Sequence, residues 1–168
     1  ANLSAHKRGW DDRWQEFSQW ADKGQVLVSS LLHLIDEDTA AFNRIMEAFG
    51  MPKTTPEEKQ ARSAAIQAAT LYASEVPLET MRESMKAFEI CRAMAETGNP
   101  NSVSDAGVGA LAARAAVRGA SMNVRINASS LKDKATAQRL IDEANALAAK
   151  ADAEEAAISA IVDGKING

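Results

Sequence analysis

Apolar residues recur along most of the chain at the three- and four-residue spacing of an amphipathic α-helix. The pattern runs almost unbroken from Asp11 to Phe49, with Gly24 as the one interior position where a break or kink costs little. Further helical stretches follow at about residues 56–76, 78–96, 105–126 and 134–162. We therefore predict an all-α fold, a multi-helix bundle with long antiparallel helices.

Turn-forming residues set the boundaries between these helices. Gly50 and Pro52 end the first helix, and the run TPEE at residues 55–58 is typical of a helix start, with an N-cap, a proline and acids in the first turn. Pro77 predicts a break or kink, because a proline inside a helix removes one hydrogen bond and crowds the preceding turn. The stretch TGNPNSVSD, residues 97–105, predicts a loop.

One acidic residue, Asp38, falls where the helical pattern of the first stretch expects an apolar side chain. At about 100° per residue, six apolar side chains point within roughly 40° of Asp38, while Asp36 points to nearly the opposite side. These six are Leu27, Leu31, Leu34, Phe42, Ile45 and Phe49. Burial in such a stripe raises the pKa of a carboxyl group toward neutrality, as a general acid or base requires. The alternative is a structural acid that bonds a neighbouring helix end or pairs with an arginine.

A second group of polar residues shares one face of the helix predicted over residues 105–126. Asn123 lies about five turns beyond Asp105, Asn127 lies one turn further, and Ser104 precedes them all. Between these polar residues the face carries only small ones: Gly109, Ala112, Ala116 and Ala120. The face therefore either lines a binding cleft or packs closely, with its polar groups serving as caps and interhelical hydrogen bonds.

Three arginines, Arg114, Arg118 and Arg125, lie on the other side of the same helix, within about 40° of one another. Such a row is typical of a solvent-exposed face. The alternative is a site for carboxylate or phosphate groups, which the forked guanidinium binds well. Lys53 and Lys59 are weaker candidates of the same kind.

The composition narrows the class of protein. With 168 residues, 46% of them hydrophobic and 25% charged, we expect one domain over residues 1–168. A net charge of −4 argues against a nucleic-acid partner, and no apolar run approaches the roughly 18 residues of a membrane span. One cysteine and no signal-like start favour a cytoplasmic location. His6 and His33 lack the spacing of metal ligands, so we expect no metal site.

Several separated motifs, in a fixed order, resemble one known family. They read DEDTAAFNRIMEAFGMPKTTPEEKQARSAAIQAA (residues 36–69), VPL (76–78), GNPNSVSDAGVGA (98–110) and NVRIN (123–127). From about Leu27 to its end the chain resembles the cyclodeaminase domain of formimidoyltransferase-cyclodeaminase, a family that also includes methenyltetrahydrofolate cyclohydrolases. The resemblance implies that the chain folds as a helical bundle, assembles as a homo-oligomer of at least two copies and acts on a folate. In the bifunctional members a formimidoyltransferase domain comes first, and the protein serves histidine degradation.

The resemblance also implies roles for individual residues. The family's catalytic aspartate is the second acid of a D-x-D-x-x-A-F motif, which reads DEDTAAF here and places that role on Asp38. Asp105, from the motif G-N-x-x-x-x-S-D, is the second implied catalytic residue. Members of the family begin with a segment that contains P-G-G-G-S, and this chain starts after it. We therefore expect the site within these 168 residues to be incomplete.

These expectations lead to the activity of a formimidoyltetrahydrofolate cyclodeaminase. In 5-formimidoyltetrahydrofolate, N10 attacks the formimidoyl carbon, the ring closes and ammonia leaves, which gives 5,10-methenyltetrahydrofolate. One carboxylate is enough to move both protons, so we expect no cofactor. The residues that we expect to contact the substrate, including its polyglutamate tail, are Ser104, Asn123, Asn127, Arg114, Arg118, Arg125 and Lys53.

Two alternatives stay open at this stage. A methenyltetrahydrofolate cyclohydrolase differs only in that water attacks the methenyl carbon, and the motifs do not separate the two activities. A non-catalytic helical module for oligomerisation differs in class, and in it Asp38 is a structural acid.

Overall fold

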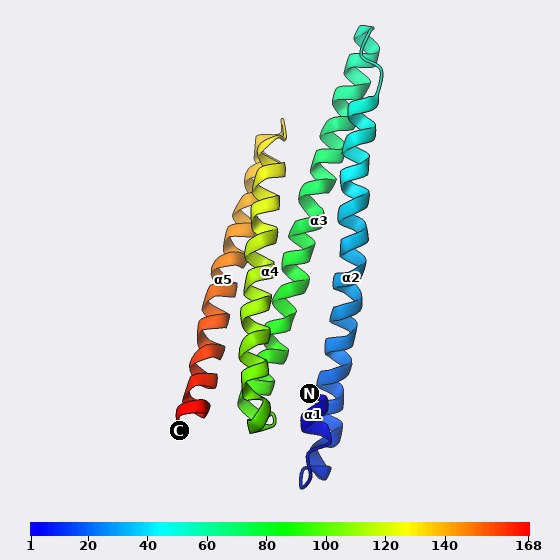
Figure 1. Cartoon of the computed structure of the whole chain (residues 1–168). Helices are drawn as coiled ribbons and strands as arrows, with labels where there is room; N and C mark the ends of the chain where they lie inside the picture. Colours follow the sequence, from blue (N-terminus) through cyan, green and yellow to red (C-terminus); the bar gives the residue numbers. More distant parts are fainter.

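The fold is a bundle of long helices that run alternately up and down (Figure 1). The computed structural model describes residues 1–168, apart from the side chain of Asp11. The four long helices are α2 (Trp14–Gly50), α3 (Pro56–Thr97), α4 (Val103–Ser129) and α5 (Lys134–Asn167). The short elements are α1 (Asn2–Ala5) and two turns of 3-10 helix, η1 (Asp11–Arg13) and η2 (Pro100–Ser102). No strand occurs in this described part, and the predicted all-α bundle with long antiparallel helices is confirmed.

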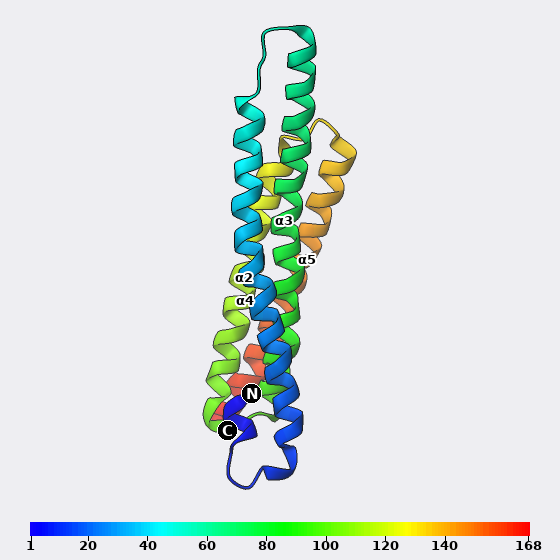
Figure 2. The ribbon, with the colours of Figure 1, turned by 90° about the vertical axis from the view of Figure 1, so that its right-hand side faces the viewer.

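Helix α3 is the central element. It packs against α2, α4 and α5, whereas α2 packs mainly on α3 and lies at one side of the bundle (Figures 1 and 2). The turn between α2 and α3 projects beyond the turn between α4 and α5, so α2 and α3 extend past α4 and α5 at this end of the bundle (Figure 1). A large part of the α2 surface therefore has no neighbour within the chain.

The start of α3 follows directly from the residues before it. Thr55 is the N-cap, its side chain accepts a hydrogen bond from the backbone N–H of Glu58, and Glu58 in turn accepts from the backbone N–H of Thr55. Pro56 occupies the first helical position, where its missing N–H costs no bond. The predicted helix start at Pro56 is confirmed.

The predicted division of α3 at Pro77 is wrong, because the helix continues through the proline to Thr97. A proline at this position leaves the carbonyl of Ala73 without its helical donor. The structure supplies another donor, since the Asn127 side-chain amide reaches across from α4 and donates to that carbonyl at 2.7 Å. Pro77 itself is buried, so packing also holds the helix together at this point.

The main core lies among α3, α4 and α5, and half of its buried residues are alanine. Such small side chains let the helix axes approach closely. A Cβ atom at Gly109 would lie only 2.9 Å from the Cys91 sulfur, and one at Gly107 would lie 3.3 Å from the Val162 side chain. Position 109 therefore cannot take a Cβ atom unless Cys91 shifts, whereas a Cβ atom at position 107 would require the Val162 side chain to move by only a few tenths of an ångström.

Helices α2 and α4 each carry apolar side chains that no other part of the chain covers. On α2 we call this row the α2 stripe, and Phe42 within it is 61% exposed. Its members are Val28, Leu32, Ile35, Phe42, Met46 and Phe49. The corresponding residues of α4 are Val108, Leu111, Met122 and Ile126. None of the described helices combines the length and the hydropathy needed to cross a bilayer.

Candidate functional site

Asp38 is exposed in the single chain, and the prediction that it points into the core is wrong for that chain. At about 100° per residue, the apolar residues of α2 cover an arc of roughly 200°. One half of the arc, with Leu27, Ala41 and Ala48 buried, packs on α3. The other half is the exposed α2 stripe, and Asp38 lies on the border between the two. The apolar stripe that the sequence pattern predicted therefore combines two different surfaces of α2, and Asp38, at its centre, lies where they meet.

Polar contacts lie beside Asp38, at the same level of the bundle. Its neighbour Glu37 accepts a hydrogen bond from the Tyr72 hydroxyl of α3, which raises the pKa of that hydroxyl. The Arg44 guanidinium carbon lies 4.1 Å from the centre of the Tyr72 ring. Tyr72 directly precedes Ala73, the residue that Asn127 contacts from α4. Asp38 and Asn127 therefore lie at one level of the bundle, with α3 between them.

A cavity of about 360 Å³ opens at this level, between α2, α3 and α5. Its polar lining residues are Glu37, Tyr72, Glu75, Glu79, Arg82 and Arg139, and Leu34, Val76, Leu78 and Leu140 supply apolar walls. The cavity thus offers both hydrogen-bond donors and acceptors, and its volume falls at the lower end of the range for small-molecule sites, about 300–1,000 Å³.

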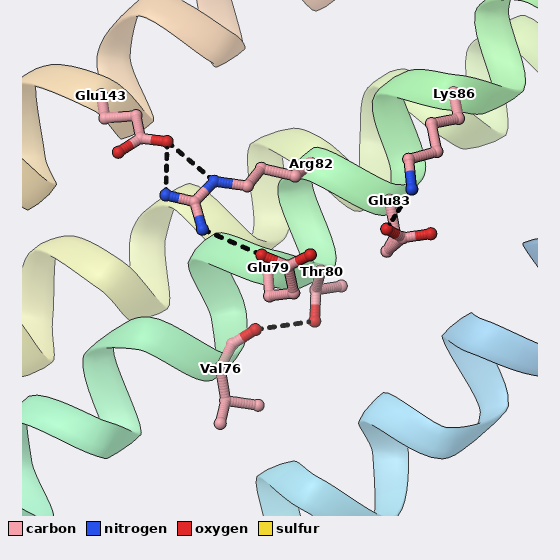
Figure 3. A network of polar contacts seen from close by, with 7 residues as sticks. All are labelled: Val76, Glu79, Thr80, Arg82, Glu83, Lys86 and Glu143. Carbon is pink, nitrogen blue, oxygen red and sulfur yellow. Dashed lines mark hydrogen bonds and ion pairs between the residues drawn. The ribbon is translucent and has the colours of Figure 1, made fainter.

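Figure 3 shows the ion pairs beside this cavity. The Arg82 guanidinium donates to Glu143 of α5 at 2.8 Å and to Glu79, one turn away on α3, at 2.9 Å. The Thr80 hydroxyl donates to the carbonyl of Val76 at 3.1 Å in the same turn. Sequence reasoning missed this cavity. Its signal was a set of acids and a base spaced by helical turns on both sides of Pro77.

Asp105 and Ser104 lie at the start of α4, near one end of the bundle and far from the level of Tyr72 and Asn127. Asp105 is exposed in the first turn of α4 and lines a cavity of about 200 Å³ together with Asn99 and Cys91. Asn123 is 18 positions further along α4, about 27 Å away. The single chain therefore does not bring Asp38 and Asp105 together, and the catalytic role of Asp105 stays a prediction. Burial raises the pKa of the Cys91 thiol.

Asn123 and Asn127 have different surroundings. Asn123 is exposed at the edge of the α4 apolar residues, so it is accessible to a ligand. Asn127 is half-buried and makes the interhelical bond to Ala73, which is the structural alternative for this face. Gly109, on the same face, packs against α3. A contact of either asparagine with substrate stays a prediction.

The arginines of α4 form ion pairs with α5. The Arg114 side chain donates to Asp152 at 2.7 Å, and Arg118 donates to both carboxylate oxygens of Asp152. The hydrogen bond from Arg118, which has the larger effect, and the one from Arg114 hold the pKa of the Asp152 carboxyl below its usual value. Arg125 donates to the Ser121 carbonyl of its own helix. Their binding of the folate tail stays a prediction.

The remaining candidate, Lys53, is exposed in the turn between α2 and α3 and lines a cavity with three other basic residues. Among the described residues, no group of three or more His, Cys, Asp and Glu side chains has the arrangement of a metal site.

Comparison with known proteins places this fold among folate enzymes. The sequence signature of the formiminotransferase-cyclodeaminase family matches residues 1–146. The chain is 38% identical, over 166 residues, to a methenyltetrahydrofolate cyclohydrolase from Methylorubrum extorquens, and the match covers 99% of the chain and 80% of that protein. The chain therefore belongs to the formiminotransferase-cyclodeaminase family. The similarity extends to the N-terminal region, beyond the Leu27 boundary that the motifs predicted.

Two further relatives complete the comparison. The formimidoyltransferase-cyclodeaminase of Gallus gallus is 36% identical over 107 residues, which is 64% of the chain but only 20% of that longer protein. The crystal structure of a formiminotetrahydrofolate cyclodeaminase from Thermotoga maritima has the same fold, with a TM-score of 0.82, 22% identity, and coverage of 98% of this chain and 78% of that one. Membership of the family supports a folate-related cyclodeaminase or cyclohydrolase function.

Proposed function

We propose that the chain hydrolyses the methenyl bridge of 5,10-methenyltetrahydrofolate. The observation that carries this proposal is the extent of the similarity to the Methylorubrum extorquens cyclohydrolase, which spans nearly the whole chain and four fifths of that protein. The match to the Gallus gallus protein, by contrast, covers a fifth of its length. Cyclodeamination of 5-formimidoyltetrahydrofolate is the second candidate, supported by the family signature over residues 1–146.

The chemistry requires one base close to the bridging carbon. Water attacks the methenyl carbon and loses a proton, and a tetrahedral intermediate forms. One carbon–nitrogen bond then breaks as the hydroxyl of the intermediate gives up its proton and the departing nitrogen takes one up, which leaves a formyl group on the other nitrogen. We assign the base to Asp38, and general acid–base help of this kind is worth about 10²–10⁴-fold in rate. In cyclodeamination the same carboxylate would move a proton from N10 to the leaving ammonia.

An exposed carboxylate is a weak base, so Asp38 must be shielded from water to act in the reaction. We infer that a second copy of the chain provides this shielding. Half of the apolar arc of α2 is open to solvent, and Asp38 lies at its edge. Contiguous exposed apolar surface is typical of protein interfaces, and two-fold pairs are the commonest assemblies. Docking of a copy on the α2 stripe would exclude water from the surroundings of Asp38. In this proposal the site is complete only in the dimer.

The test compares two aspartates on the same helix. Asp38→Asn should lower the rate of methenyl hydrolysis by 10²-fold or more, with the helical circular dichroism and the oligomeric state unchanged. The matched control is Asp36→Asn, an exposed acid two residues away that should leave the rate near wild type. Loss of methenyl absorbance and release of ammonia from the formimidoyl substrate, measured in parallel, separate the two activities. Near-normal turnover by Asp38→Asn would remove Asp38 from the mechanism.

A second pair of variants tests the dimer. Phe42→Arg places a charge in the α2 stripe and should give a monomer that is folded but inactive. Ile166→Arg changes an equally exposed apolar residue near the end of α5 and should remain a dimer. Sedimentation velocity at one fixed protein concentration measures the oligomeric state of both variants, and the hydrolysis assay measures their activity. A wild-type protein that sediments as a monomer at assay concentrations and is still active would refute the shared site.

A further inference from the structure

The middle of α2, which carries Asp38, is held against α3 mainly by contacts that have no direction. These contacts form a small apolar cluster between the two helices. Its buried members are Ala41, Ala73 and Val76, and the half-buried Leu34, Ile45 and Tyr72 pack at its edge. Apolar contact depends on the area buried and little on orientation, and short alanine side chains offer only low ridges to interlock. The cluster therefore holds α2 on α3 but sets little limit on small sliding or rolling motions.

One polar contact with a defined direction joins the two helices at this level. The Tyr72 hydroxyl of α3 donates a hydrogen bond to one carboxylate oxygen of Glu37 on α2. The other Glu37 oxygen lies 3.7 Å from the side-chain nitrogen Nε2 of His33. Two turns further along α2, the Arg44 guanidinium lies over the Tyr72 ring. Helix α2 therefore holds Tyr72 at two points, its hydroxyl and its ring.

The other polar contacts between α2 and α3 in the described part of the chain are far from this level. The ion pair of Lys23 with Glu89 lies 14 residues before Glu37, about 21 Å along α2. The hydrogen bond from Arg62 to the Phe49 carbonyl lies 12 residues after Glu37, about 18 Å away. Over the middle of α2, the hydrogen bond from the tyrosine is therefore the contact that can fix the rotation and height of the helix.

Glu37 and Asp38 lie on opposite sides of the line along which α2 touches α3. Adjacent residues of a helix are about 100° apart. Glu37 faces the cavity shared with α5, whereas Asp38 borders the α2 stripe. A roll of α2 by about 20° would move a carboxylate that lies about 5 Å from the helix axis by roughly 2 Å. A misplacement of about 1 Å can cost about 10²-fold in rate, so the contact at Glu37 bears directly on the chemistry at Asp38.

We propose that Tyr72 is a positioning residue for Asp38, because its hydrogen bond to Glu37 fixes the rotation of α2 on α3. The role of Asp38 as the base rests on the proposed function. Tyr72 acts through α2 and not on the substrate. Its loss should fall on the chemical step, since a displaced base slows proton transfer while the groups that hold the substrate stay the same.

The first experiment separates the hydrogen bond from the other properties of the two side chains. Tyr72→Phe keeps the ring and its Arg44 contact, and it should lower kcat about tenfold or more, with KM within about twofold of wild type. Glu37→Ala should give the same loss, and the double variant should lose no more. Glu37→Gln keeps an oxygen that accepts the bond and should retain kcat. The matched control is Lys23→Met, which removes the distant ion pair with Glu89 and should leave kcat unchanged.

A second experiment reports on the helix itself and needs no turnover. Spin labels on Asp36→Cys of α2 and Gly119→Cys of α4, in a Cys91→Ala background, give the distance between the two helices. Both labelled positions are exposed in the full chain. Tyr72→Phe should broaden this distance distribution, and Glu37→Gln should leave it as narrow as in the parent. Circular dichroism and sedimentation velocity should show the same helix content and oligomeric state in every variant.

Each measurement can overturn the proposal. Wild-type kcat in Tyr72→Phe, equal losses in Glu37→Gln and Glu37→Ala, or unchanged label distances would do so. A raised KM with unchanged kcat would do so as well, because it indicates lost binding. If the chain turns over neither folate, or if Asp38→Asn retains full turnover, the proposed function or the role of Asp38 is wrong. The label distances then still decide whether the hydrogen bond fixes α2.

Discussion

The hydrogen bond from Asn127 to the Ala73 carbonyl, which Pro77 leaves without its helical donor, leads to a quantitative prediction about stability. The Ala73 carbonyl loses its helical donor to the proline, and the Asn127 amide replaces that donor at 2.7 Å. Ala73 is buried, with 5% of its surface exposed, so water cannot readily take the place of the amide. Asn127→Ala should therefore leave a buried acceptor without a partner, at a cost of about 1–3 kcal/mol.

The cost should depend on the proline. In the Pro77→Ala background residue 77 has an N–H group, which can donate to the Ala73 carbonyl within the helix. Asn127→Ala should then cost less than about 1 kcal/mol. The double-mutant cycle should therefore show a coupling free energy of about 1 kcal/mol or more. In a domain of this size each 1 kcal/mol corresponds to about 2–4 °C in Tm.

Thermal and urea unfolding, followed by circular dichroism, measure the four proteins of the cycle. All four must be compared at one protein concentration, because association shifts the apparent stability. The control is Asn123→Ala, which removes an exposed amide one turn earlier on α4 and should change stability by less than about 0.5 kcal/mol. Equal costs of Asn127→Ala with and without Pro77 would refute the reasoning.

Two further predictions concern the packing of α4 and its ion pairs with α5. Gly109→Ala should destabilise the chain by about 1–3 kcal/mol, because its Cβ would lie 2.9 Å from the Cys91 sulfur. Gly119→Ala meets no atom within 4 Å and should stabilise the helix by about 0.5–1 kcal/mol. A higher Tm for Gly109→Ala than for Gly119→Ala would contradict this packing. Asp152 has a lowered pKa in the folded state. Its ion pairs therefore stabilise the fold at pH values above about 3.9, the pKa of the carboxyl in the unfolded chain, and this stability is lost as the pH falls. Acid unfolding of Asp152→Asn should show a smaller loss of stability between about pH 5 and 3, and an unchanged pH dependence would argue against the pairing.

Local sequence signals predicted the helices well, and long-range contacts explain the exceptions. The TPEE run at residues 55–58 places the start of α3 because the cap involves only neighbouring residues. The continuity of α3 at Pro77 depends on Asn127, which is 50 residues away in the sequence. No local pattern contains that information.

The candidate site was predictable only in part for a similar reason. Periodicity shows that α2 has a wide apolar arc, but it does not say which half faces α3 and which half is left open. The placement of Asp38 therefore came out wrong for the single chain. The cavity lined by Lys53 and Lys132 likewise combines residues of two separate turns with residues of α3, and these come together only in the folded bundle.

The alanine-rich core gives this bundle an unusual response to mutation. Most cores lose stability through truncation, when a large side chain is cut back and leaves a void. Here half of the buried positions hold a side chain of one carbon, so little volume can be removed from them. Harmful substitutions at these positions are the ones that add atoms, since helices in such close contact must separate to admit them. A saturation library of α4 and α5 should consequently be depleted of bulkier residues, while glycine and serine survive at many of the same positions.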